Sequence, residues 1–198
     1  MVIDELRRRL TEECASLAVA REVLPLWTDR GLADYSCTLH SAGVTYWTSL
    51  GQRLGYQAFV EMPPPLRGAY AHVGLDVRSD SAWYSRDSVR PSVLVEFERY
   101  AGAIDEGKLM AKVSNLLLAH HRWEQAAGAL VLAYWTKSVA TLPDHRAMKE
   151  RVRSGFETAA KERVAGSSSC RLLIFQTVLR QTADGTWRLW QMIERGTE

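Results

Sequence analysis

Three acidic residues lie near the ends of apolar stretches, where their carboxylates could act together. Asp80 opens the short stretch "SAWY", and Glu96 and Glu98 close the strongly apolar stretch that begins at Ser92. Because alternate residues of a strand share a face, the two glutamates continue the side that Leu94 begins. A strand typical of a protein core therefore carries two acids on one side, and this placement needs a chemical explanation.

A bound cation would supply that explanation. If the two stretches pair as a hairpin, their carboxylates converge at one end of a sheet, since adjacent strands lie about 5 Å apart. Carboxylates that close repel one another unless a proton or a cation neutralises them. Mg²⁺ takes oxygen ligands, including a few carboxylates, and can polarise a phosphoryl group and activate water. A single acid at a strand end is most often a solvated surface residue, so only the combination favours a metal site.

Two further acids compete for a place in this site. Glu61 ends an apolar stretch of its own and is either a further metal ligand or a plain acid at a strand end. Asp76 is a rival for Asp80, because an offset of four residues keeps the same side of a strand. The apolar "SAWY" that follows Asp80 favours Asp80.

The hydrophobic pattern predicts the elements that would position these acids. Helices are expected over 4–20, 40–54, 108–123 and 144–164, and strands over 56–62, 81–84, 92–100 and 128–135. The segment 171–193 is expected to form a hairpin, with the turn Ala183-Asp184-Gly185 between two alternating runs. Together these elements predict an α/β protein with a small mixed sheet flanked by helices.

Length and composition set the outer limits. The chain has 198 residues and a formal charge of +2, which predicts one domain and gives no overall polycationic signal for nucleic acid or membrane. Three scattered cysteines without a CxxC motif favour free thiols in a reducing compartment over a disulfide framework or a zinc site. The longest apolar run, 128–135, is too short to span a bilayer. We therefore expect a cytoplasmic protein with no membrane partner.

The order of elements resembles a known nuclease superfamily. A helix, the strands "GYQAFVEMP", "SDSAWY" and "VLVEFE", the helix "KVSNLLLAHH" and the strand "LVLAYW" follow one another over residues 40–136. This order resembles the αβββαβ core of the PD-(D/E)xK superfamily, which has the restriction-endonuclease-like fold. The resemblance implies a nuclease-like core over 39–137, with an N-terminal helical addition (1–38) and a C-terminal helix and hairpin (138–198).

The resemblance also implies roles for individual residues. Asp80 matches the aspartate of the motif and Glu96 its second acid, so both would bind metal. Ser79 stands where the motif has proline, and Glu98 stands where it usually has lysine, so Glu98 would bind a second metal or orient the attacking water. The following helix would then supply the positive charge through Lys112, in preference to Lys108, to stabilise charge on the phosphate. The polar stripe expected to contact nucleic acid on that helix comprises Lys108, Asn115 and Arg122.

Two basic clusters have an ambiguous meaning. Arg146, Lys149 and Arg153 share one face of the expected helix 144–164 and could follow a phosphate backbone, as could the arginines at 7–9. Acids are interleaved with the cations of that helix, and this favours a solvated face with salt bridges. His120 and His121 end a helix and point to different faces, which favours a packed or capping role over metal binding.

Three functions follow as hypotheses. The favoured one is a metal-dependent endonuclease that hydrolyses phosphodiester bonds of DNA with Mg²⁺ or Mn²⁺, as a homodimer or within a larger complex that supplies targeting. The alternative is a catalytically inactive nuclease-fold subunit that binds nucleic acid or a protein partner, which the replacement of the motif lysine by Glu98 supports. A third is a small α/β interaction protein with no role on nucleic acid.

Overall fold

A computed structural model describes residues 3–14, 16–35, 37–66, 69–73, 77–137 and 141–195. Asp76, the rival of Asp80, lies outside the described residues. The helices are α1 (Ile3–Cys14), α2 (Leu17–Val23), α3 (Thr38–Arg53), α4 (Glu106–Arg122) and α5 (His145–Ser154), with short turns η1 (Leu26–Arg30) and η2 (Ala103–Asp105). The strands are β1 (Gln57–Met62), β2 (Pro65–Leu66), β3 (Ala69–Val73), β4 (Ser79–Tyr84), β5 (Pro91–Arg99), β6 (Ala129–Thr136), β7 (Gly155–Glu157), β8 (Arg163–Ala165), β9 (Arg171–Gln181) and β10 (Trp187–Arg195).

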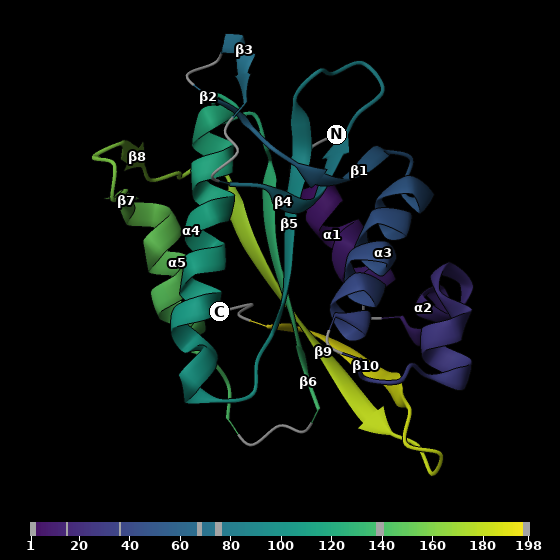
Figure 1. Cartoon of the computed structure of the whole chain (residues 1–198). Helices are drawn as coiled ribbons and strands as arrows, with labels where there is room; N and C mark the ends of the chain where they lie inside the picture. The colour runs from purple at the N-terminus through teal and green to yellow at the C-terminus, as the bar shows by residue number, and fades with distance from the viewer. Residues whose placement is uncertain are drawn as a thin grey trace.

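Six of these strands form one mixed sheet in the order β1-β4-β5-β6-β9-β10. The central strands β5, β6 and β9 are parallel, and the outer pairs are antiparallel. Figure 1 shows α4 and α5 on one face of the sheet and α1, α2 and α3 on the other. The expected α/β class, with a mixed sheet flanked by helices, is confirmed. Within the described part of the chain, no helix is long and apolar enough to cross a membrane.

The alternation of β5 decides which side chains face which helix layer. Val93, Val95 and Phe97 belong to the core half formed with α3, whereas Leu94 belongs to the half formed with α4. Glu96 shares the side of Leu94, so the fold directs its carboxylate toward α4. Strand β6 is buried along its whole length, as expected of a strand with parallel neighbours and helices on both faces.

The expected helix 144–164 is too long. Helix α5 ends at Ser154, because Gly155 takes a φ of +75°, and a Cβ there would lie 2.3 Å from the carbonyl oxygen of Val164. The chain then turns into the hairpin β7–β8. Glu157 and Lys161, spaced as a helical ion pair, instead pair within that hairpin. The expected helix 4–20 is likewise divided, with Ser16 capping α2 through the amide of Val19.

The C-terminal hairpin is confirmed and is continuous with the central sheet. Strands β9 and β10 pair antiparallel, and Asp184 in the turn accepts a hydrogen bond from the amide of Thr186. Strand β9 also pairs parallel with β6 from Arg171 to Val178. The segment expected as an addition therefore widens the sheet beyond β6.

Candidate functional site

The site begins where β4 separates from β5. The two strands pair from Tyr84 opposite Pro91 to Ser81 opposite Val95, and the described ladder ends there. At the next residue, a side chain replaces the backbone as the hydrogen-bond acceptor. Asp80 Oδ2 accepts a 2.7 Å hydrogen bond from the backbone N–H of Phe97. Asp80 thus satisfies a strand amide that the ladder leaves open. This bond holds a nearly buried carboxylate between the diverging strands.

Helix α3 fixes the other side of Asp80. The ring of Phe97 packs edge-on against the ring of His40, with centroids 6.2 Å apart. Gly43 lies so close to Phe97 that an added Cβ would meet its ring at 2.0 Å. His40 also places its Nε2 3.9 Å from Asp80 Oδ1. Close packing of α3 on β5 therefore positions both the amide donor and an imidazole beside the carboxylate.

Helix α4 brings a lysine to the same point. Lys112 Nζ lies 2.6 Å from Glu96 Oε2 and 3.6 Å from Asp80 Oδ2. Glu96 is fully buried, and the Lys112 side chain is 21% exposed. Two carboxylates from neighbouring strands and one ammonium from the following helix thus meet at the separation of β4 and β5.

The charges of this cluster are strongly coupled. Burial raises the pKa of Glu96 well above its ordinary value, and the charge of Asp80 raises it further, while Lys112 opposes both effects. Burial lowers the pKa of Lys112, but attraction to Glu96 and Asp80 outweighs it, and the net pKa is raised. Lys112 therefore remains charged and partly compensates the two acids.

A divalent cation fits two of these residues. No group of three or more His, Cys, Asp or Glu gathers for metal binding within the described ranges. Mg²⁺, however, commonly uses one or two protein carboxylates and completes its shell with water and substrate phosphate. Asp80 and Glu96 provide such a pair. Glu96 Oε1 is buried and makes no hydrogen bond to the described residues, and a cation would satisfy it.

Glu98 lies beside the cluster and has its own partner. Its Oε1 accepts a 2.8 Å hydrogen bond from Lys108 Nζ and a 2.7 Å bond from the amide of Arg99. Glu98 and Lys108 line a cavity of about 650 Å³, together with His40 and Lys137. Glu98 thus lines this cavity, and α4 supplies a lysine to each of the two glutamates.

Glu61 is placed at the surface. Its side chain is 58% exposed and lies 3.7 Å from the guanidinium of Arg78. Its φ of +52° is unusual for a residue other than glycine and marks an irregular end of β1. Its contact with Arg78 directs the carboxylate to a surface ion pair.

The expected nucleic-acid stripe of α4 is divided by the fold. Lys108 is exposed and Asn115 is half-buried, but Arg122 is buried and donates to both oxygens of Glu162. Glu162 lies between β7 and β8, and β8 packs against α4. The unexpected hairpin therefore covers the end of the stripe and withdraws Arg122 from the surface.

Sequence reasoning missed the residues contributed by distant segments. His40 had only the signal of a polar residue at the start of a predicted helix. Lys137, which follows β6, approaches the ring of Trp187 on β10 to 4.6 Å and pairs with Asp34. These contacts join segments far apart in the sequence, and the approach of Lys137 to Trp187 depends on a sheet order in which β9 lies next to β6 and β10 lies next to β9.

Comparison with known proteins identifies no relative. No protein-family model matches the chain, and neither the curated proteins nor the solved structures gave a match. The function must therefore be argued from the site itself.

Proposed function

We propose that this protein is a metal-dependent nuclease that hydrolyses phosphodiester bonds, with DNA as its substrate. One observation supports this proposal above the others. Asp80, Glu96 and Lys112 converge where β4 leaves β5, with Lys112 Nζ 2.6 Å from one carboxylate and 3.6 Å from the other. Two carboxylates can hold a divalent cation that polarises a phosphate, and a lysine can stabilise the charge that develops on it.

The residues of the chain divide this work. Asp80 and Glu96 would hold Mg²⁺ or Mn²⁺, which when bound polarises the phosphate and makes water more acidic. Lys112 would move its ammonium from Glu96 toward the phosphate and stabilise the charge that develops there. The Asp80 carboxylate is kept in place by the amide of Phe97, so this ligand is oriented before substrate arrives.

The cavity beside Glu98 offers a path for the substrate. Its wall includes His40, Arg99, Lys108 and Lys137, all of which can donate hydrogen bonds to phosphate oxygens. His40 touches both this cavity and the edge of the carboxylate cluster through Asp80. A nucleic-acid strand that occupied the cavity would bring a phosphate next to the two acids.

Cleavage assays test the proposal directly. Supercoiled plasmid and end-labelled single and double strands are incubated with Mg²⁺, Mn²⁺ or EDTA. We expect metal-dependent cleavage by the wild type and at least about a 100-fold loss in Asp80→Asn and in Glu96→Gln. Asp87→Asn, which alters an exposed acid in the β4–β5 turn, serves as the matched control and keeps wild-type activity. Equal cleavage by Asp80→Asn and the wild type would exclude this site.

An inactive binding subunit is the second candidate, and a specific contact favours it. Because Lys112 already neutralises part of the charge of Glu96 and Asp80, the cluster can persist without metal. A folded wild type that cleaves none of the substrates with either metal, yet retards labelled DNA in EDTA, would establish this function and overturn the first.

A further inference from the structure

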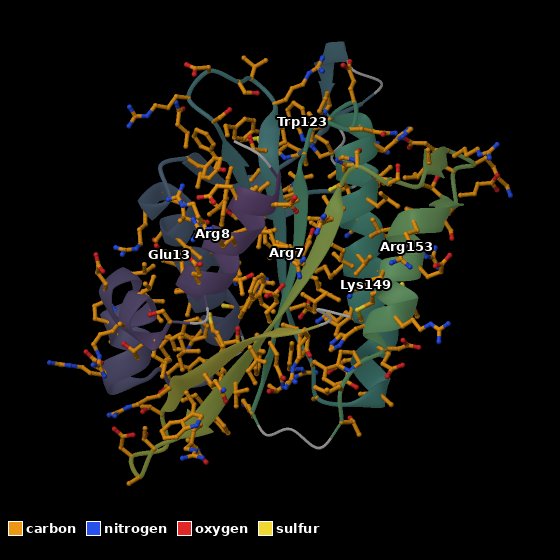
Figure 2. All side chains as sticks on the ribbon, turned by 180° about the vertical axis from the view of Figure 1, so that it is seen from behind. Arg7, Arg8, Glu13, Trp123, Lys149 and Arg153 are labelled. Carbon is orange, nitrogen blue, oxygen red and sulfur yellow. The ribbon has the colours of Figure 1, made fainter. Side chains whose placement is uncertain are left out.

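A second cavity lies at the start of β9, far along the chain from the carboxylate cluster. Arg195, the last described residue of β10, pairs with Ile174, so Arg171–Leu173 extend past that point. A cavity of about 500 Å³ opens there. Figure 2 shows Arg7 on α1 and Lys149 and Arg153 on α5, on the two sides of the strand. The cavity therefore receives side chains from both helix layers.

Positive charge dominates this cavity. The described residues lining it include one carboxylate, Glu194. The cations among them are Arg7, Lys149, Arg153, Arg171 and Arg195. Five cations and one acid give +4, whereas the whole chain carries +2, so all other residues together carry −2. The lining of this cavity thus carries a local excess of positive charge in a nearly neutral protein.

The acid of the lining compensates little of this charge. Glu194 lies 3.5 Å from the guanidinium of Arg7, and its other oxygen accepts a 2.8 Å bond from Thr11. Arg153 is 3.9 Å from Glu150 and Arg171 is 3.1 Å from Asp4, and the four side chains are 48–71% exposed. Exposed pairs of this kind contribute little. Their weakness leaves the arginines able to bind another anion.

Arg195 is oriented by a neutral group. Both its Nε and Nη2 donate to Oε1 of Gln176, at 2.9 and 2.5 Å. Gln176 is fully buried, and its amide nitrogen donates to Thr136 Oγ1. The guanidinium is therefore held in position by a buried amide, and these two bonds leave its positive charge intact.

Part of the wall is apolar, beside Ser167, Ser168 and Cys170. Val152 from α5 and Leu172 and Leu173 from β9 line the same cavity. These side chains are at most 9% exposed. Inorganic phosphate would bind the cations alone, whereas a ligand with both an anionic and an apolar part would also contact the apolar part of the wall. A volume of about 500 Å³ lies within the range of cavities that bind small ligands. Arginine forks match the oxygens of phosphate.

We propose that this cavity is a nucleotide-binding site, with the phosphates on the arginines and the base against Val152 and Leu172. The site is distinct from the carboxylate cluster. Its lining shares no residue with the cavity beside Glu98. Its occupation is therefore independent of whether the protein cleaves nucleic acid.

Calorimetric titration of the full chain tests this site. ATP, pyrophosphate and adenosine are titrated into the wild type, Arg153→Gln, Arg171→Gln and the control Arg86→Gln, which alters an exposed arginine in the β4–β5 turn. We expect saturable binding of ATP, weaker binding of pyrophosphate and the weakest binding of adenosine. Each cavity variant should raise the Kd for ATP about tenfold or more, because a charge-assisted hydrogen bond is lost. Arg86→Gln should leave the Kd unchanged.

Three results would overturn the proposal. The first is no saturable ATP binding by folded wild type, and the second is an unchanged Kd in both cavity variants. The third is binding of a short DNA duplex that is lost in Arg153→Gln and Arg171→Gln and that ATP does not compete with. This result would show that the cavity binds a nucleic-acid backbone.

Discussion

The two charged regions of the molecule handle their charge in opposite ways. At the carboxylate cluster, the acids Asp80 and Glu96 are buried and a lysine of the same chain lies against them. At the cavity beside β9, the cations are more exposed, and the single acid of the described lining faces five of them. The first region carries a buried counter-charge, whereas the second carries a local excess of positive charge that exposed ion pairs offset only weakly.

This difference explains what each region requires for binding. If a divalent cation binds Asp80 and Glu96 as proposed, it would compete with Lys112 for the charge of Glu96 and would leave the lysine free to act on phosphate. An anion that enters the cavity would instead compete with part-exposed ion pairs, such as Arg7 with Glu194 and Arg171 with Asp4. The comparison therefore predicts that removal of a cation has opposite effects on stability in the two regions.

The largest effect is expected from removal of Lys112. In EDTA, Lys112→Met should lower the free energy of unfolding by about 3–5 kcal/mol, because it leaves buried carboxylates without their partner. The measurement is urea denaturation followed by circular dichroism. Mg²⁺ should restore part of the loss, since a ligand that binds only the folded state stabilises it.

Lys108→Met is the matched control for this change. It removes a lysine of the same helix that also pairs with a glutamate at 2.8 Å, but Lys108 is 53% exposed. An exposed pair is worth about 0–1 kcal/mol. An equal loss in the free energy of unfolding in Lys112→Met and Lys108→Met would show that burial does not make the Lys112 pair stronger. It would contradict the contrast drawn between buried and exposed charge.

His120, which also lies on α4, is a buried titratable group without a charged partner among the described residues. It is 1% exposed, and neither ring nitrogen has a hydrogen-bond partner among the described residues. Burial, with a smaller contribution from His121, lowers the pKa of His120 to about 4. Where α4 supplies no counter-charge, the buried group stays neutral.

The pH dependence of the free energy of unfolding tests whether His120 is buried in its neutral form. Between pH 6.5 and 4, His120 is protonated in the unfolded chain but stays neutral in the folded protein. The free energy of unfolding therefore falls as pH falls. The shift corresponds to about 3 kcal/mol across that window. His120→Leu should remove this part of the slope, whereas His121→Leu should keep most of it. Parallel pH profiles for the wild type and His120→Leu would contradict the assignment.

Local pattern predicted much of the fold because the relevant contacts are local or between sequence neighbours. The apolar runs of β4, β5 and β6 and the periodicity of α4 are strong, and a short turn joins β4 to β5. Antiparallel pairing across that turn brings Asp80 near Glu96, and α4 follows β5 closely enough to place Lys112 over them. Asp80 and Glu96 could therefore be proposed together from the strand pattern, whereas Lys112 is proposed from the resemblance to the nuclease superfamily.

Other features depend on contacts that no local pattern reveals. Gly155 lies within a charged, helix-like run, and its positive φ begins the hairpin whose Glu162 buries Arg122. The basic cavity combines segments near residues 7, 153, 171 and 195, which meet only because β9 pairs with β6 and α1 and α5 cover opposite faces. In the sequence, the acids interleaved with these cations favoured a solvated face.

The smallest expected effect is the change in the free energy of unfolding when Arg153 is replaced, and its sign tests whether the two regions differ. In low salt without nucleotide, Arg153→Gln should raise the free energy of unfolding by about 0.2–0.5 kcal/mol, because it relieves repulsion among cations. The gain should fade at high salt, where screening shortens the reach of that repulsion. Urea denaturation at two salt concentrations measures both effects, with Arg86→Gln as the control. A clear loss of stability would mean that the exposed contact of Arg153 with Glu150 outweighs the repulsion among the cations. A gain, set against the loss in Lys112→Met, would show that one region holds its cation for the fold and the other holds its cations for a ligand.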